Sequence, residues 1–329
     1  MTSHLRPHRR RFLGLAVSVT TLPLLVRRGR ADTYPSRPVR ILVGSPPGGT
    51  LDIVARLIAQ WLTQRLGQSF VIENRAGAGT NIAADAVAHA TPDGYTLLLA
   101  ASPNAINVTL YDKLNFDFMR DIIPVAAIER APLLMAVNPS FPAKTAAEFI
   151  AYAKANPGKI NQGSGGIGST GHVAGELFKM MAGVEIAHVP YRGEPPALTD
   201  LIGGRVQVVF STAGSLVGYM KAGTLRALAV TTKTELPALT GVPLLADAVP
   251  GYDATSWVGI AAPRRTPAEI VATLNREINA GLADPKLSGQ LADLGAAAFS
   301  ASPAAFETFI SAEVEKWRKV VKTAGLKPE

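Results

Sequence analysis

The chain has 329 residues, with 33 Lys and Arg, 25 Asp and Glu and no cysteine. The lack of cysteine excludes disulfides, thiolate metal sites and cysteine nucleophiles. Of the basic residues, seven arginines lie in the first 31 positions, where there is no acidic residue. The remaining chain has 26 basic and 25 acidic residues, a net charge of +1, so we expect no nucleic-acid-binding face, which needs clustered basic side chains.

The first 31 residues have the features of an export signal. Residues 9–13 read Arg-Arg-Arg-Phe-Leu, a twin-arginine pattern, and the apolar run 12–26 is too short to span a bilayer. Gly29 and Ala31 are small residues at the positions that precede a cut before Asp32. We predict a periplasmic, monomeric mature protein that starts near Asp32. An uncleaved anchor is the alternative, and the twin-arginine and general secretory routes both stay open.

From residue 38 onward, short apolar runs alternate with segments of helical period. In the first part of the chain this pattern predicts strands at 39–43, 70–72 and 95–100, and helices at 51–66 and 81–89. An order of this kind predicts a parallel sheet with helices on both faces.

The same order recurs in the middle of the chain. It predicts strands at 133–137, 186–189, 206–210 and 225–230, and helices at 145–155, 173–181, 196–202 and 215–221. Two long amphipathic helices, 267–283 and 303–324, are expected to cover the N-terminal sheet. We therefore predict an α/β protein of two lobes after the leader 1–31. Lobe 1 comprises 32–131 and 235–329, and lobe 2 comprises 132–234.

Two glycine-rich loops, Gly44–Thr50 and Gln162–Thr170, each follow a strand and open a helix. Glycine lets a backbone approach a ligand closely, and the N–H groups of a first helical turn favour an anion. In open α/β sheets ligands bind beyond the carboxyl ends of the strands. The pair predicts a clamp for a carboxylate, with one loop from each lobe, and valine at Gly49 or Gly165 should crowd it. The alternative is that both loops are simply tight turns.

Patterns for cofactor and hydrolase chemistry are incomplete. Gly163, Gly165 and Gly168 satisfy G-x-G-x-x-G, but Glu185 precedes the next strand where a dinucleotide site needs an acidic residue at its end. No G-x-S-x-G elbow is present. The histidines after the leader share no metal-ligand spacing. The sequence therefore predicts no catalytic residues, no metal and no cofactor.

Three polar side chains near the loops allow two interpretations each. Asp52, in a first helical turn, either organises its loop or meets a ligand amine. His172 either donates to a ligand or caps its own loop, and Arg192 either attracts an anion or is a solvated surface residue. His188, at a strand end, is expected to be a core residue.

Several ordered motifs resemble the Bug family, the periplasmic binding proteins of tripartite tricarboxylate transporters. They are Tyr-Pro-Ser-Arg-Pro-Val-Arg at 34–40, Pro-Pro-Gly-Gly at 46–49, Glu-Asn-Arg-Ala-Gly-Ala-Gly at 73–79, Pro-Asp-Gly-Tyr-Thr at 92–96 and His-Val-Pro-Tyr-Arg-Gly at 188–193. The segments 225–230 and 317–329 are similar too, so the resemblance runs from about residue 34 to the C-terminus. It implies a type II periplasmic-binding-protein fold with a ligand cleft between two lobes. It also implies a carboxylate held by backbone groups, small hydroxyl side chains and bridging water.

The loops and the resemblance together give one set of predicted ligand-binding residues. The set is Ser45, Pro47, Gly48, Gly49, Asp52, Ser102, Ser164, Gly165, Gly166, Ser169, His172, Tyr191, Arg192 and Ser211. Two positions depart from the family pattern, because Gln207 and Ser211 stand where the family often has Asp. Losing an acidic group near the cleft should change which ligand amine or hydroxyl is accepted.

We predict a binding protein that captures a small organic acid or amino acid and delivers it to the permease subunits of a tripartite transporter. It is not expected to be an enzyme, because the loops offer Gly, Ser and Thr and no poised acid, base or nucleophile. The alternatives are a periplasmic sensor subunit that reports the ligand to a membrane kinase, and an enzyme of unrecognised type. The identity of the ligand stays open.

Overall fold

The computed structural model describes residues 34–233, 239 and 241–328. Residues 34–329 form one compact unit. The predicted leader, the cut after Ala31 and the lobe boundary between residues 234 and 235 lie outside the described residues. Across the described ranges, no helix has the length and apolar content needed to cross a membrane.

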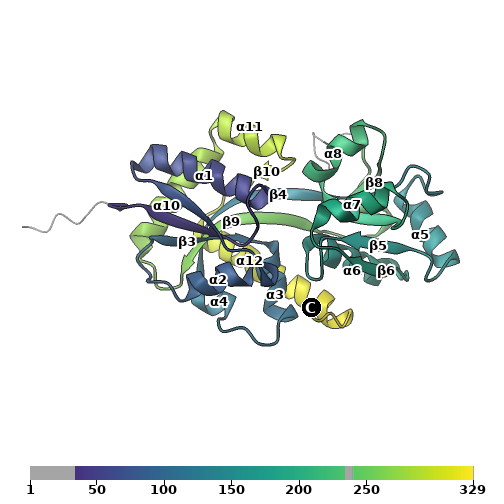
Figure 1. Ribbon diagram of the computed structural model, residues 1–329, viewed down its shortest axis with the longest axis horizontal. Helices are drawn as coiled ribbons and strands as arrows, with labels where there is room; N and C mark the ends of the chain where they lie inside the picture. Colours follow the sequence, from purple (N-terminus) through teal and green to yellow (C-terminus); the bar gives the residue numbers. More distant parts are fainter. Residues whose placement is uncertain (1–33, 234–238, 240, 329) are drawn as a thin grey trace, which may run out of the picture. The chain divides into compact units, whose positions relative to one another are not determined.

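The strands of the described chain form a mixed sheet (Figure 1). They are β1 (Val39–Val43), β2 (Phe70–Asn74), β3 (Thr96–Ala101), β4 (Ile122–Val137), β5 (Asn161–Ser164), β6 (Ala187–Pro190), β7 (Val208–Thr212), β8 (Arg226–Val230), β9 (Thr255–Pro263) and β10 (Ala297–Ala298). Their order is β2-β1-β3-β9-β4-β7-β5-β6, with β8 and β10 also paired to β4.

Helices cover this sheet (Figure 1). They are α1 (Thr50–Leu66), α2 (Asn81–Ala88), α3 (Ser102–Leu110), α4 (Phe118–Asp121), α5 (Ala146–Ala155), α6 (Thr170–Ala182), α7 (Glu194–Ile202), α8 (Ala213–Lys221), α9 (Leu245–Ala248), α10 (Ala268–Leu282), α11 (Pro285–Asp293) and α12 (Pro303–Thr323), with a 3-10 turn at Ala78–Thr80. The predicted strands and helices are all present, and apart from β4 and α6 their ends lie within two residues of prediction.

Parallel pairing is confirmed in two blocks, β2-β1-β3 and β6-β5-β7. Between them lie β9 and β4, which run antiparallel to their neighbours, an arrangement the sequence did not indicate. The long β4 pairs with β9 along 122–132 and with β7 and β8 along 133–137. Only its last five residues were predicted as strand. The rest was missed because Pro124 and Pro132 argue against a central strand.

The core follows from the two side-chain periods. In β1, Val39, Ile41 and Val43 point to one apolar cluster, and Leu42 points to the other, as a strand of period two requires. Helices α1 and α10 pack in the first cluster, whereas α3 and α12 pack in the second. Helices α10 and α12 therefore both contact β4, and they do so from opposite faces of the sheet.

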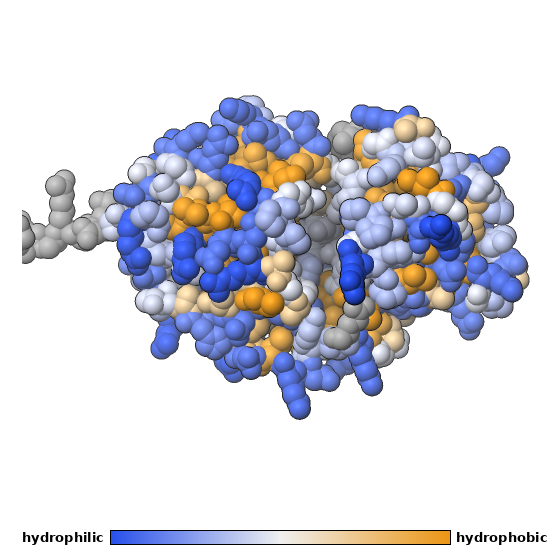
Figure 2. All heavy atoms as spheres, in the orientation of Figure 1, coloured by the Kyte–Doolittle hydropathy of each residue, from blue (hydrophilic) through white to orange (hydrophobic). Residues whose placement is uncertain are grey.

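One helix departs from its expected burial. The predicted apolar positions of α6 include Val173 and Leu177, which are buried, but Met180 and Met181 are 44% and 37% exposed. Figure 2 shows that apolar side chains on one face of the molecule are interspersed with polar ones, and that this face is hollowed between the group around α1 and β3 and the group around α7 and β5.

Candidate ligand-binding site

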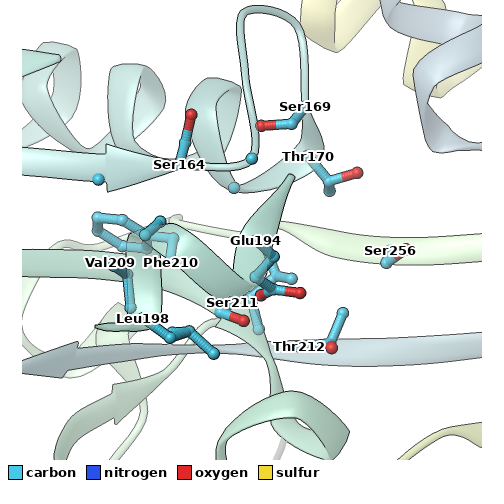
Figure 3. Close-up of a pocket in the computed structure, with 15 residues that line it drawn as sticks. Ser164, Ser169, Thr170, Glu194, Leu198, Val209, Phe210, Ser211, Thr212 and Ser256 are labelled. Carbon is cyan, nitrogen blue, oxygen red and sulfur yellow. The ribbon is translucent and has the colours of Figure 1, made fainter. Parts of the chain in front are cut away.

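A cavity of about 160 Å³ lies at the carboxyl ends of β5 and β7, where α6 and α7 begin (Figure 3). Its polar wall consists of Ser164, Ser169, Thr170, Glu194, Ser211, Thr212 and Ser256. Its apolar wall consists of Leu133, Ala197, Leu198, Val209 and Phe210. The lining contains no Lys or Arg, so any anion here must be held by backbone and hydroxyl groups.

The start of α6 supplies those backbone groups. Ser169 is the N-cap, and its hydroxyl accepts a hydrogen bond from the N–H of His172 at 3.3 Å. Within the described residues, the N–H groups of Thr170 and Gly171 have no acceptor. Together with the helix dipole, two free N–H groups at a cavity wall favour a carboxylate.

Gly171 is required by packing against β7. A Cβ atom built on Gly171 would lie 2.2 Å from the carbonyl oxygen of Phe210. Real Cβ atoms do not come this close to a backbone oxygen, so α6 can begin beside β7 only if this position is glycine. The close approach places the first turn of α6 directly at the cavity.

A pair of stacked histidines supports the loop behind this turn. The Nδ1 atom of His172 accepts the N–H of Gly168 at 3.1 Å, and its ring stacks on that of His188 with a centroid separation of 3.6 Å. The Nε2 atom of His188 lies 2.6 Å from the Oγ atom of Ser164. Burial, and next the neighbouring His172, lower the pKa of His188 to about 4. His188 is therefore neutral at neutral pH, and His172, 2% exposed, caps its own loop.

Glu194 is the one ionisable residue of the cavity lining, and the sequence did not single it out. It follows the N-cap Gly193 of α7. The hydroxyl of Ser215 donates to its Oε2 atom at 3.0 Å, and the Oγ1 atom of Thr212 lies 2.9 Å from that of Ser215. Burial raises the pKa of Glu194. An acidic residue in a first helical turn is common, so only its position after a strand end could have indicated a place in the cavity.

The first glycine-rich loop is organised differently, around Asp52. The Oδ2 atom of Asp52 accepts from the N–H of Gly48 at 2.9 Å and from Nε of Arg56 at 2.8 Å. Its Oδ1 atom accepts from Arg56 at 3.0 Å and from Asn74 at 2.9 Å. The Arg56 hydrogen bond is the main reason that the pKa of Asp52 is lowered to about 2. With both oxygens engaged, Asp52 holds its own loop together, and Asn74 also donates to the carbonyl oxygen of Ser45.

The cavity brings together four of the predicted ligand-binding residues, namely Ser164, Gly165, Ser169 and Ser211. The Oγ atom of Ser211 is buried and has no partner among the described residues. Gly166, in the same loop, and His172, in the first turn of α6, do not line the cavity. Thr170, Gly171, Glu194, Thr212 and Ser256 line it and were not predicted.

Other predicted residues lie elsewhere. Ser45, Pro47, Gly48, Gly49 and Asp52 form the first loop and do not line the cavity.

Three more predicted side chains have contacts of their own or face solvent. The hydroxyl of Ser102 is fully buried and accepts from the backbone N–H of Trp257 at 2.9 Å. The hydroxyl of Tyr191 donates to Asp200 at 2.7 Å, and Arg192 is exposed. These contacts give Ser102 and Tyr191 structural roles in this conformation.

Nowhere in the described chain are three His, Asp or Glu side chains grouped as a metal ion requires. A larger hollow of about 890 Å³ lies beside α8, α11 and β10, and it contains none of the residues predicted to bind a ligand.

Comparison with known proteins identifies the family. Residues 54–326 match the tripartite tricarboxylate transporter family receptor. The chain belongs to this family. It is 36% identical to protein BugT of Bordetella pertussis over 300 residues, which is 90% of this chain and 92% of that protein. The resemblance to the Bug family is thereby confirmed, and with it the interpretation as a periplasmic binding protein and not an enzyme.

Solved structures of the same family agree with the fold. The R. palustris protein Rpa4515, solved with adipate, has a TM-score of 0.82 and 42% identity, covering 90% of this chain and 100% of that one. MatC from Rhodopseudomonas palustris, solved with bound malate, has a TM-score of 0.77 and 33% identity, covering 88% of this chain and 100% of that one. The predicted type II periplasmic-binding-protein fold is confirmed.

Proposed function

We propose that this chain captures a small carboxylate-bearing molecule and delivers it to the membrane subunits of a tripartite tricarboxylate-type transporter. The observation that carries the proposal is the start of α6, where Thr170 and Gly171 line a cavity without basic side chains and their N–H groups have no acceptor among the described residues. A carboxylate is the small anion that two such groups and nearby hydroxyls hold well. The adipate and malate in the two related structures are both carboxylates, which supports this ligand class.

We further propose that the chain divides into lobes, 32–131 with 235–329 and 132–234, and that ligand closes them. The support is the pairing of β4, which changes partners from β9 to β7 and β8 near residue 132. Closure would bring the loop that starts at Gly44 toward the cavity. Such hinge motion is a common response to a ligand that contacts two lobes. Small-angle scattering should show a smaller radius of gyration when a saturating ligand is added.

The ligand is identified by purifying the protein from periplasm, denaturing it and analysing the released compound by mass spectrometry. A panel of organic acids is then tested by thermal unfolding. An acid present at 100 times its Kd should stabilise the folded state by about 2.7 kcal/mol. If no organic acid binds, and the released compound carries no carboxylate, the proposed ligand class is wrong.

Delivery is tested separately, in cells. Deleting the gene for this chain should abolish uptake of the identified acid when the permease subunits are present, and restoring the gene should recover it. Normal uptake without this chain, combined with a lost transcriptional response to the acid, would favour the sensor role instead.

A further inference from the structure

The cavity has two chemically different sides (Figure 3). Ser169 and Thr170, at the start of α6, lie on one side, and Glu194, Ser211 and Thr212 lie on the other. The first side offers N–H donors and suits an anion. The second offers a carboxyl group and hydroxyls, and an ionised carboxyl group can only accept hydrogen bonds. A molecule with a carboxylate at each end would therefore place one of them against Glu194.

Glu194 is fixed in place by neighbouring hydroxyls. When Glu194 is ionised, the single hydroxyl hydrogen of Ser215 goes to its Oε2 atom at 3.0 Å. Thr212 must then donate to Ser215 across their 2.9 Å contact. Among the described residues, Ser215 is the one side chain that donates to Glu194. No Lys, Arg or His of the described ranges forms an ion pair with the carboxyl group of Glu194, so the cavity keeps an acceptor that a ligand donor can satisfy.

Ser211 points to the same conclusion independently. Its side chain lines the cavity beside Glu194, the residue is 3% exposed, and its Oγ atom has no partner among the described residues. A buried hydroxyl without a partner costs free energy. A ligand group that both donates and accepts, or a donor shared with Glu194, would satisfy it.

We propose that Glu194, with Ser211, selects carboxylates that also carry a hydrogen-bond donor, either an ammonium or a hydroxyl group. This rests on the proposed function, because the ligand carboxylate must lie at the start of α6 for its donor to reach Glu194. An ammonium group gains the charge interaction with Glu194 as well as the hydrogen bond, so amino acids should be preferred to hydroxy acids. A simple dicarboxylate meets like charge and should bind least well.

The test uses calorimetry on the mature protein with carboxylic acids of two to eight carbons, in sets matched in chain length. Succinate, malate and aspartate form one such set, with hydrogen, hydroxyl and ammonium at the same carbon. In the set that binds best, the amino or hydroxy acid should bind at least tenfold more tightly than the unsubstituted acid. Glu194→Gln keeps the size and a hydrogen bond to Ser215 but removes the charge. It should reduce the preference for the amino acid at least tenfold, and the unsubstituted dicarboxylate should bind more tightly because the like charge is gone.

Two controls separate the outcomes. Glu307→Gln changes a carboxylate on α12 that pairs with Arg264 and does not line the cavity. This variant should alter no affinity. Ser211→Ala should weaken hydroxy acids more than unsubstituted acids. If unsubstituted acids bind as tightly as the others, or Glu194→Gln lowers all affinities equally, Glu194 is structural and the inference fails while the proposed function stands. If no carboxylic acid binds at all, the proposed function fails and takes this inference with it.

Discussion

The two glycine-rich loops look alike in sequence and behave differently in the structure. Each follows a parallel strand and opens a helix, yet only the loop before α6 lines the cavity. In the loop before α1, the carboxylate of Asp52, in the first helical turn, accepts from the N–H of Gly48. Before α6 the cap is the neutral Ser169, and no residue of the described ranges accepts from the N–H groups of Thr170 and Gly171.

The difference teaches how a helix start is used. The charge of Asp52 in the first turn partly offsets the positive end of α1 and opposes an external anion, although the N–H groups of Thr50 and Leu51 also have no acceptor among the described residues. A serine cap satisfies one N–H group and leaves the dipole uncompensated. We propose that the first loop is a support organised by Asp52 and that the second is the anion site. The variants below test that contrast.

The largest effect is expected from Gly171→Ala. Its Cβ atom would lie 2.2 Å from the carbonyl oxygen of Phe210, so α6 must shift away from β7. Overpacking of this kind should lower the free energy of unfolding by about 3 kcal/mol and weaken carboxylate binding more than tenfold. Denaturant titration and calorimetry measure the two effects.

The matched control is Gly49→Ala, at the N-cap of α1. Its nearest neighbour would be the carbonyl oxygen of Pro46 at 3.6 Å, an ordinary contact. An alanine cap in place of glycine should cost only about 0.5 kcal/mol. Equal losses for the two variants would remove the contrast between the loops.

The sequence predicted that Gly49→Val crowds the loop. The space around Gly49 is open in this structure, so we expect this variant to weaken binding only when ligand closes the lobes.

The next effect concerns Asp52→Ala. The substitution leaves the N–H of Gly48, the amide of Asn74 and the guanidinium of Arg56 without their shared acceptor. Hydrogen bonds to a charged group contribute more than neutral ones, so we expect a loss of about 2 kcal/mol in unfolding free energy. Glu315→Ala removes an exposed ion pair with Arg318 on α12 and should cost about 0.5 kcal/mol or less. A loss no greater than that of Glu315→Ala would mean that the first loop does not depend on Asp52.

Acidification should weaken the second loop before the first. The pKa of His188 falls from 6.5 to about 4 on folding, so the unfolded chain binds the proton more readily between these values. The contribution of His188 to the free energy of unfolding is therefore fully present above pH 6.5, where the ring is neutral in both states. It is lost as the pH falls from 6.5 toward 4. Asp52 has a pKa of about 2 against an ordinary 3.8, so its contribution is lost only below pH 3.8.

His188→Gln isolates the first step, because glutamine does not titrate. The difference in unfolding free energy between the original chain and this variant should fall as the pH drops from 6.5 to 4 and stay constant above 7. The same difference measured with Asp52→Asn should change only below pH 4. A His188 difference that is independent of pH would show that the ring is not buried as the stack with His172 requires.

Sequence reasoning found both loops because strand, glycine run and helix are local patterns. It could not rank them, since the ranking depends on contacts between distant residues. Asn74 reaches Asp52 from β2, and Phe210 meets Gly171 from β7. Glu194 was missed for the same reason. It follows the end of β6, and only the pairing of β5 with β6 and β7 brings that end beside Ser211. Nothing local in the sequence shows that the hydroxyl of Ser102 accepts from Trp257, and its predicted contact with a ligand stays a prediction.

The smallest effect is expected from Arg192→Ala, and it decides how the carboxylate is held. Arg192 is exposed, does not line the cavity and has no hydrogen bond or ion pair with any described residue. Surface substitutions of this kind change stability by about 0.5 kcal/mol or less. If backbone N–H groups hold the ligand, the Kd measured by calorimetry should change less than twofold. The association rate should fall slightly at low salt, where a distant positive charge still attracts an anion. A loss of binding above tenfold would instead mean that closure brings Arg192 onto the carboxylate, and that a side-chain ion pair, not the start of α6, holds the ligand.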